Sequence, residues 1–212
     1  MNIIHKWILE NLSKTPTIIE AGVCDGLDTN FFATSFPEGK IYGFEPIPGL
    51  FHQALELNKA HSNVMLNQLA LGEITENKKI YVSDRFGKDW GSSSILKPKE
   101  HLNYHKEISF NSKIEVSIVN LDEWCELNNI TQVDLMWLDL QGMEPSVIKS
   151  SPNIISKTKF IYSEVSLIDT YENVMIYDKF KKYMIGVGFE VVFEDLQWKD
   201  MGNVLFRNIN QV

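Results

Sequence analysis

Short apolar runs alternate with amphipathic stretches along most of the chain, which predicts strands connected by helices. The runs expected to form strands lie at residues 17–21, 41–44, 63–68, 113–119, 133–138, 159–165, 189–194 and 203–206. Apolar positions at helical spacing predict helices at residues 28–35, 49–60, 121–129, 144–150 and 171–186, and one within residues 1–15. Alternation of this kind is typical of a mainly parallel sheet with helices on both faces.

The last two predicted strands differ from the others in their connection. Parallel strands need a long crossover, and the link between residues 194 and 203 is short, so this pair is expected to be antiparallel. The run VDLMWL at residues 133–138 is apolar throughout, as a strand buried on both faces must be. We therefore predict a doubly wound α/β fold with a mostly parallel, seven-stranded sheet and an antiparallel C-terminal strand pair.

Residues 82–111 interrupt the alternation. This stretch is polar, mixes Gly, Ser, Lys and His, and is long enough to form a lid or a substrate-binding loop. Neither a linker nor an internal repeat divides the 212 residues, so we expect one domain with residues 82–112 as its lid.

Composition and charge narrow the classes of partner. The formal net charge of −8 argues against a nucleic-acid surface, which needs clustered Lys and Arg. Cys24 and Cys125 are far apart and fit no metal-ligand spacing. No apolar run approaches the ~18–20 residues of a membrane span, and the N-terminal stretch lacks the features of a signal peptide. We expect a cytoplasmic protein that acts on a small molecule or a glycan; its oligomeric state is left open.

The first predicted strand ends in EAGVCDG, residues 20–26. Glycines at a strand-to-helix turn let the backbone approach a ligand closely. A dinucleotide turn is typically G-x-G-x-x-G, whereas this one has two glycines and two acids that would repel a pyrophosphate. The acids suit a ligand with an ammonium and a sulfonium, as in S-adenosylmethionine. The predicted contacts to this cofactor are Glu20, Gly22, Asp25 and Gly26.

Two further strand ends complete the predicted cofactor site. Glu45 lies 23 positions after Gly22, close to the spacing at which an acid accepts hydrogen bonds from ribose hydroxyls. Pro46 forces an extended backbone on Glu45 and ends the strand there. After the third strand, Gln68 and Leu69 could hold an adenine by its amine and its face, although an ordinary strand exit explains them equally well.

In their order along the chain, these motifs resemble the FkbM family of methyltransferases. The matching segments are EAGVCDG (20–26), FEP (44–46), ALG (70–72), LDEW (121–124), LDLQGME (138–144) and IYSEV (161–165). The resemblance implies a class I methyltransferase fold, S-adenosylmethionine as cofactor, and transfer to a hydroxyl of a sugar or natural product. Two positions depart from the family: its usual Lys two residues before Asp139 is Trp137, and its first Glu after Asp139 is Gln141, which cannot act as a base.

Three acids are the candidate catalytic residues, and one of them, Asp139, is also predicted to contact the cofactor. Asp139 directly follows the strand at residues 133–138, Glu164 stands at the next strand end, and Glu144 starts the helix between them. An alcohol is a poor nucleophile, so a base or a metal should help to remove its proton. We favour Asp139 as the base over Mg²⁺ held by Asp139 and Glu164, because no acidic cluster has a clear metal spacing. Glu144 could instead cap its helix.

Polar residues of the predicted lid offer further candidates. His101 and His105, at i and i+4, could bind zinc from one helical face, but the missing third ligand favours a solvent-facing pair or substrate-loop residues. Ser92, Ser93 and Ser94 either contact cofactor or substrate or form a flexible turn.

Two other functions stay open at this point. A different nucleotide-binding enzyme, such as a dehydrogenase, is disfavoured by the missing third glycine. A non-catalytic scaffold or S-adenosylmethionine-binding domain is suggested by the departures at Trp137 and Gln141.

Overall fold

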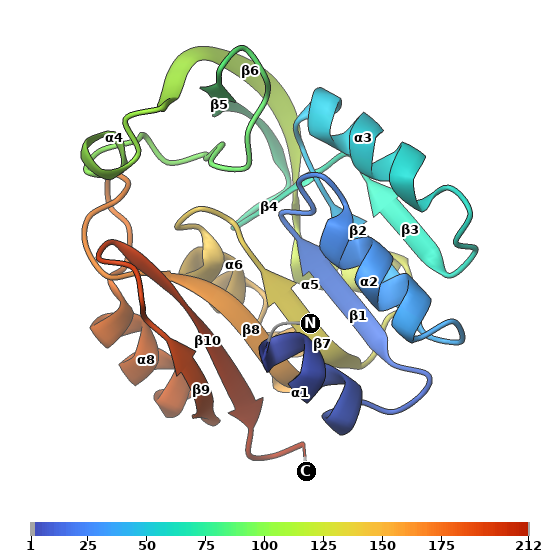
Figure 1. Ribbon diagram of the computed structural model, residues 1–212. Coiled ribbons are helices and arrows are strands. Elements are labelled where there is room, and N and C mark those ends of the chain that lie inside the picture. Colours follow the sequence, from blue (N-terminus) through green and yellow to red (C-terminus); the bar gives the residue numbers. More distant parts are fainter. Residues whose placement is uncertain (1–2, 212) are drawn as a thin grey trace.

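The computed structural model describes residues 3–211, which form two β-sheets and eight helices (Figure 1). The strands of the main sheet are β1 (Thr17–Ala21), β2 (Lys40–Phe44), β3 (Val64–Asn67), β7 (Val133–Leu138), β8 (Thr158–Ser166), β9 (Phe189–Asp195) and β10 (Met201–Asn208). Their order is β3-β2-β1-β7-β8-β10-β9, with β10 antiparallel to both of its neighbours and the other pairs parallel. The predicted fold class is confirmed.

Helices cover both faces of the main sheet because successive side chains of a strand point to opposite sides. Ile18 of β1 packs in the core under α1 (Ile3–Asn11) and α2 (Leu27–Ser35), and its neighbour Ile19 packs in the core of the other face. That face carries α5 (Leu121–Leu127), α6 (Glu144–Ser150), α7 (Pro152–Ser156) and α8 (Tyr177–Gly186). α3 (Pro48–Asn58) packs beside α2. None of the helices within residues 3–211 is long and apolar enough to cross a membrane.

The structure contains a second sheet, of which the sequence predicted only part. It contains β4 (Ala70–Gly72), β6 (Ile108–Asn120) and β5 (Glu76–Arg85), in that order, and lies at the top of the view in Figure 1. Residues 82–85 and 108–112, predicted as loop, therefore extend two strands. One face of this sheet packs on Ile47 and Leu50 and the other is exposed, so the outward polar residues concealed the strand pattern.

The segment between β5 and β6 includes the short helix α4 (His101–Tyr104) and is fastened to the loop after β8. The backbone amides of Lys99 and His101 donate to the carbonyl of Thr170 at 2.9 and 3.1 Å, and that of Glu100 donates to Asp169 at 3.1 Å. The amide of Glu172 returns a hydrogen bond to Lys97 at 2.8 Å. The helix predicted from residue 171 begins only at Tyr177, because the preceding backbone makes these contacts instead.

Candidate active site

The order of the main sheet reverses between β1 and β7, and ligands in doubly wound folds bind beyond the carboxyl ends of strands at such a point. Gly22 lies there with φ of +87°, and a Cβ on it would lie 1.9 Å from the carbonyl oxygen of Asp139. Its amide donates to the carbonyl of Phe44 at 3.0 Å. The turn after β1 therefore crosses the end of β7 at a distance that only glycine permits.

Glu45 occupies the end of β2 and faces the same crevice. Its two carboxylate oxygens accept hydrogen bonds from the amides of Cys24 and Ile47, each at 2.9 Å. Each oxygen keeps a further lone-pair site for a ligand. The side chain is almost fully buried, and burial raises the pKa of Glu45 to about 7. A buried carboxylate fixed by two backbone amides is suited to accept hydroxyl donors such as those of a ribose.

An inner cavity opens beside Glu45. Its apolar walls are formed mainly by Phe44, Ile47, Leu69, Leu71, Ile80 and Ile95. Its polar lining includes Glu45, Ser94 and Asp139. Such a cavity can hold a flat heteroaromatic base against aliphatic walls.

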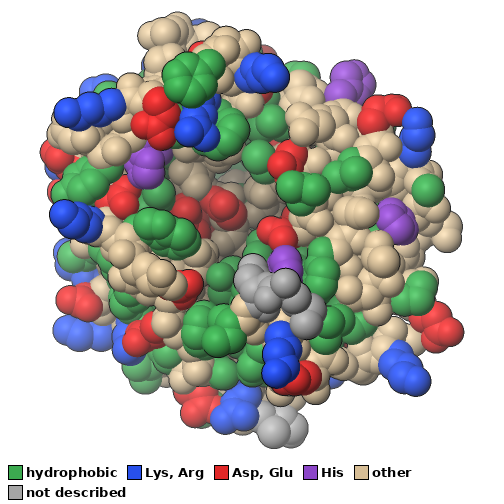
Figure 2. Space-filling view, in the orientation of Figure 1, with side chains coloured by type: hydrophobic (Ala, Val, Ile, Leu, Met, Phe, Trp, Pro, Cys, Tyr) green, Lys and Arg blue, Asp and Glu red, His purple; other side chains and the backbone are tan. Residues whose placement is uncertain are grey.

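A wider opening, the outer cleft, adjoins the inner cavity. Gly22, Glu45, Trp90 and Asp139 line both spaces. Figure 2 shows a hollow in this face of the molecule, with acidic side chains inside it and hydrophobic and basic side chains on its rim. The other residues of the cleft include Asp25, Arg85, Phe86, His105, Gln141 and Glu164. Two joined compartments, with Asp139 at their boundary, can bring two substrates together.

Three predicted cofactor contacts lie outside both spaces. Glu20 is buried and accepts a hydrogen bond at 2.5 Å from the Thr29 hydroxyl of α2. Gly26 starts α2, and a Cβ there would lie 2.8 Å from the Cα of Ala54, so its role is to let α2 approach α3. Gln68 is exposed, because its side chain points out from the short link between β3 and β4. The expectation of direct cofactor contact by these three residues is not supported by their positions.

Glu144 starts α6, but its side chain does not cap that helix. Its oxygens accept hydrogen bonds from the amides of Leu140 at 2.6 Å and Gly142 at 3.0 Å. It is buried, lines neither space, and burial raises its pKa to about 8. Glu144 therefore holds the turn between β7 and α6, and the geometry does not support a catalytic role for it.

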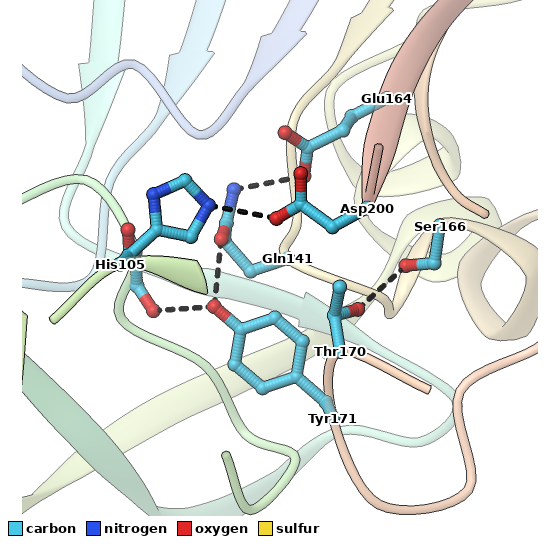
Figure 3. Close-up of polar contacts among 8 residues, drawn as sticks. His105, Gln141, Glu164, Ser166, Thr170, Tyr171 and Asp200 are labelled. Carbon is cyan, nitrogen blue, oxygen red and sulfur yellow. Dashed lines mark hydrogen bonds and ion pairs between the residues drawn. The ribbon is translucent and has the colours of Figure 1, made fainter. Parts of the chain in front are cut away.

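Gln141 connects the two remaining acids (Figure 3). Its amide nitrogen lies 2.7 Å from Asp139 Oδ1 and 2.8 Å from Glu164 Oε2, and its amide oxygen lies 2.7 Å from the hydroxyl of Tyr171. Gln141 adopts a left-handed backbone with φ of +52°, a strained conformation of the kind that clusters at functional sites. A glutamate in this place would have added a third carboxylate, whereas the amide donates to both neighbours.

Burial raises the pKa of both Asp139 and Glu164. Hydrogen bonds from Gln141 and Glu164 partly offset this effect at Asp139, whereas the charge of Asp139 raises the pKa of Glu164 further. Burial therefore favours the protonated form of both acids, and the charge of Asp139 adds to this effect at Glu164.

Some of the lid serines and histidines line the site, and others hold its residues in place. The Ser94 hydroxyl donates to the carbonyl of Gln141 at 2.9 Å, and the Tyr171 hydroxyl lies 2.9 Å from the carbonyl of Ser92. His105 lines the outer cleft, as a substrate-loop residue would. His101 is fully buried, so the expectation of a solvent-facing pair is wrong for it.

Several site residues were not predicted from the sequence. Tyr171, Trp90 and Asp200 come from loops without a local motif, and Gln141 was recognised only as a departure from a family pattern. Trp137, the second departure, packs in the core with its ring centroid 4.1 Å from that of Tyr162 and 5.4 Å from that of Phe32, and lines neither space.

The fold and this crevice together define a class I methyltransferase. Residues 20–191 match the Methyltransferase FkbM domain, so the chain belongs to the FkbM family of S-adenosylmethionine-dependent methyltransferases, as its motifs predicted. The chain is 32% identical over 173 residues to the 2-O-methyltransferase NoeI of Sinorhizobium fredii, covering 80% of this chain and 71% of that protein. It is 20% identical to the methyltransferase sdnD of Sordaria araneosa, covering 92% of this chain and 81% of that protein.

Solved structures resemble the chain in fold. Fibrillarin of Aeropyrum pernix, crystallised with natively bound S-adenosyl-L-methionine, superposes with a TM-score of 0.53 at 12% identity, covering 92% of this chain and 68% of that chain. A putative rRNA methylase of Clostridium thermocellum gives a TM-score of 0.55 at 13% identity, covering 99% of this chain and 95% of that chain.

Proposed function

We propose that this protein transfers the methyl group of S-adenosylmethionine to a hydroxyl of a sugar or glycan-like acceptor. The observation that carries the proposal is the position of Asp139, which lines both an apolar cavity beside Glu45 and the open outer cleft. The activity named for NoeI, 2-O-methylation, supports oxygen as the target.

The chemistry of the walls supports this cofactor. The aliphatic side chains of the inner cavity would hold the adenine, and Glu45 would accept hydrogen bonds from the ribose hydroxyls. Gly22 would leave room for the methionine part, and Asp25 and Asp139 would complement its positive charges. When bound, S-adenosylmethionine supplies an electrophilic methyl group at the boundary of the two spaces.

Most of the rate enhancement in such a reaction can come from alignment of the two reactants, worth up to ~7–11 kcal/mol in favourable cases. Asp139, held by the Gln141 amide, accepts a hydrogen bond from the acceptor and orients it. Glu164 lines the same cleft and accepts a hydrogen bond from the same amide. Replacement of Asp139 by Asn is expected to spare cofactor binding and to remove most of the turnover.

We propose that no metal takes part. Carboxylate oxygens of Asp139, Glu144 and Glu164 lie within 4.8 Å of one another, which is a spacing that a cation could bridge. The Gln141 amide, however, already donates to Asp139 and Glu164, and backbone amides occupy both oxygens of Glu144. Activity is therefore expected to survive EDTA; loss on chelation and recovery with Mg²⁺ would reverse this conclusion.

The rim of the outer cleft suits a sugar. Trp90 is 40% exposed, Phe86 is 82% exposed, and the Arg85 guanidinium lies 4.6 Å from the Trp90 ring centroid. A fixed aromatic ring beside polar donors offers a flat surface for the apolar face of a sugar. The acidic side chains inside the cleft and the net charge of −8 favour such an acceptor over a nucleic acid. We also propose a cytoplasmic location.

The proposal is tested by offering labelled S-adenosylmethionine and a panel of sugars, oligosaccharides and nucleic acids to the protein. Label in a carbohydrate, removed by Glu45→Ala and Asp139→Asn but not by the surface variant Glu38→Ala, is the expected result. Label in RNA or DNA alone would contradict the proposed acceptor class.

A further inference from the structure

A second proton-accepting group opens on the outer cleft. His105 Nε2 lies 2.7 Å from Asp200 Oδ2 (Figure 3). The Asp200 side chain is 5% exposed, whereas that of His105 is 30% exposed. His105 lines the same cleft as Asp139, Gln141 and Glu164. A histidine fixed by a buried carboxylate and facing a substrate cleft has the arrangement of a general base.

We propose that His105 is the catalytic base that removes the proton of the acceptor hydroxyl, and that Asp200 is the positioning residue that orients it. The inference rests on the proposed function, because it assigns the proton of that reaction. It moves to His105 the role that the sequence analysis gave to Asp139, and leaves Asp139 to orient the acceptor.

The contact with Asp200 selects the tautomer of His105. An ionised carboxylate can only accept hydrogen bonds, so Nε2 carries the hydrogen and donates it to Asp200. Nδ1 then keeps a free lone pair. Within residues 3–211 no hydrogen-bond donor reaches Nδ1, so this atom can accept a proton from a ligand in the cleft.

Both members of the pair are held in place from separate elements. The His105 amide donates to the carbonyl of His101 at 2.9 Å, which ends α4, and the two imidazole rings lie 4.6 Å apart. Asp200 precedes β10, and its carbonyl accepts a hydrogen bond from the Leu167 amide at 2.8 Å. The orientation of the His105 ring is therefore fixed before a substrate binds.

Asp139 is less suited to take the proton. Its Oδ1 accepts a hydrogen bond from the Gln141 amide, which also donates to Glu164. A proton added to Asp139 would weaken this contact, because a neutral acid is a poorer acceptor than a carboxylate. A proton added to His105 is offset directly by the Asp200 carboxylate.

In the proposed step, proton transfer accompanies methyl transfer. The hydroxyl proton passes to Nδ1 of His105 while an oxygen lone pair forms the bond to the methyl carbon. The carbon–sulfur bond breaks and its electron pair stays on sulfur, so that the sulfonium becomes the neutral thioether of S-adenosylhomocysteine. The proton then leaves His105 for the solvent that fills the open cleft.

Kinetics of His105→Ala, His105→Gln and Asp200→Asn test the inference, with His52→Ala, an exposed histidine on α3, as the control. The two His105 variants are expected to lose about 10²–10⁴-fold in kcat and to keep the cofactor affinity of the wild type, which also shows that they are folded. Added imidazole should restore part of the activity of His105→Ala. Asp200→Asn should lose kcat with little change in KM and should not respond to imidazole.

A second measurement needs no acceptor. Nitrogen-15 spectra are expected to show the His105 proton on Nε2 in the wild type and a changed tautomer in Asp200→Asn. A proton on Nδ1 in the wild type, or normal turnover of a hydroxyl acceptor by His105→Ala, overturns this inference alone. A wild-type protein that methylates no hydroxyl would overturn the proposed function and the inference with it.

Discussion

At the scale of single residues, Glu45 is the most informative contact to the cofactor. Its carboxylate is fixed by the amides of Cys24 and Ile47, so a ligand meets a rigid acceptor. Hydrogen bonds to charged groups contribute about 1.5–3 kcal/mol each, so Glu45→Ala is expected to weaken S-adenosylmethionine binding by about tenfold or more. Titration calorimetry measures this, with Glu38→Ala as the exposed control. Equal affinities of wild type and Glu45→Ala would remove Glu45 from the site.

Cofactor binding should also release protons near neutral pH. Burial raises the pKa of Glu45 to about 7, and ribose hydroxyls donate more strongly to its ionised form, so binding lowers this pKa. Affinity is therefore expected to rise from about pH 6 to about pH 8. Calorimetry at about pH 7 in two buffers of different ionisation enthalpy measures the proton release, which Glu45→Gln should reduce. Identical heats in both buffers for the wild type would contradict the expectation.

Gly22 was predicted to let the backbone approach a ligand, and in the structure it lets the backbone approach Asp139. A Cβ at this position would lie 1.9 Å from the Asp139 carbonyl, and its φ of +87° is unfavourable for other residues. Gly22→Ala is expected to lower the denaturant midpoint and to abolish cofactor binding. The control is Gly87→Ala, which has a similar φ of +81° but no atom within 4 Å of the added Cβ. Equal losses in the two variants would show that backbone strain alone is responsible.

Whether a residue belongs to the site depends on the direction of its side chain, and the sequence does not give that direction. Glu20 stands in the glycine motif, yet it points to Thr29 of α2. Gln141 was excluded as a base, but nothing in its motif indicated that its amide would join Asp139 to Glu164, an acid 23 positions further along the chain than Gln141 itself. The contact of His105 with Asp200 joins residues 95 positions apart, which a single sequence cannot relate.

At the scale of elements, prediction was accurate where the apolar pattern is strong. The strand at residues 133–138 and the helix at residues 144–150 were located with their observed ends. The strand is buried along nearly its whole length and is flanked by the polar residues Gln132 and Asp139. β5 and β6 were partly missed because one of their faces is exposed and polar.

The lid is now expected to consist of two parts with different mobility. The amides of Lys99, Glu100 and His101 are hydrogen-bonded to the loop after β8, and ion pairs of Lys97 with Glu172 and of Lys99 with Asp169 reinforce this fastening. Residues 86–89 are largely exposed and carry few such contacts. Hydrogen exchange should be slow at residues 99–101 and fast at residues 86–89 in the free protein, and the fast part should slow when cofactor and acceptor are bound. Uniform protection of the whole stretch would contradict a mobile lid.

At the scale of the whole molecule, several acids are buried with raised pKa values. Burial raises the pKa well above 4.5 for Glu20 and Glu164, to about 7 for Glu45 and to about 8 for Glu144. The unfolded chain loses these protons at lower pH than the folded chain does. Folding stability is therefore expected to fall as the pH rises from the unfolded values near 4.5 through the folded values.

Denaturant unfolding at about pH 6.5 and about pH 8.5 measures this slope. Burial lowers the pKa of His101 from 6.5 to about 4, so His101 makes the folded state more stable as the pH rises through that range. Starting the measurement at about pH 6.5 leaves most of this opposite effect out. The wild type should have the lower free energy of unfolding at the higher pH. Glu20→Gln, which keeps an oxygen acceptor for Thr29, should show a smaller slope. An increase in stability over this range would refute the assignment of buried, protonated acids.

The central claim, that the crevice methylates oxygen, is tested most directly by following the methyl carbon itself. With carbon-13 in the methyl group of S-adenosylmethionine and a carbohydrate acceptor, the spectrum should lose the sulfonium methyl signal and gain that of a methyl ether. The gain should be absent with Asp139→Asn and unaffected by the exposed control Glu38→Ala. A methyl signal on nitrogen, carbon or sulfur of the acceptor, or a sulfonium signal that persists with every carbohydrate supplied, would contradict the account.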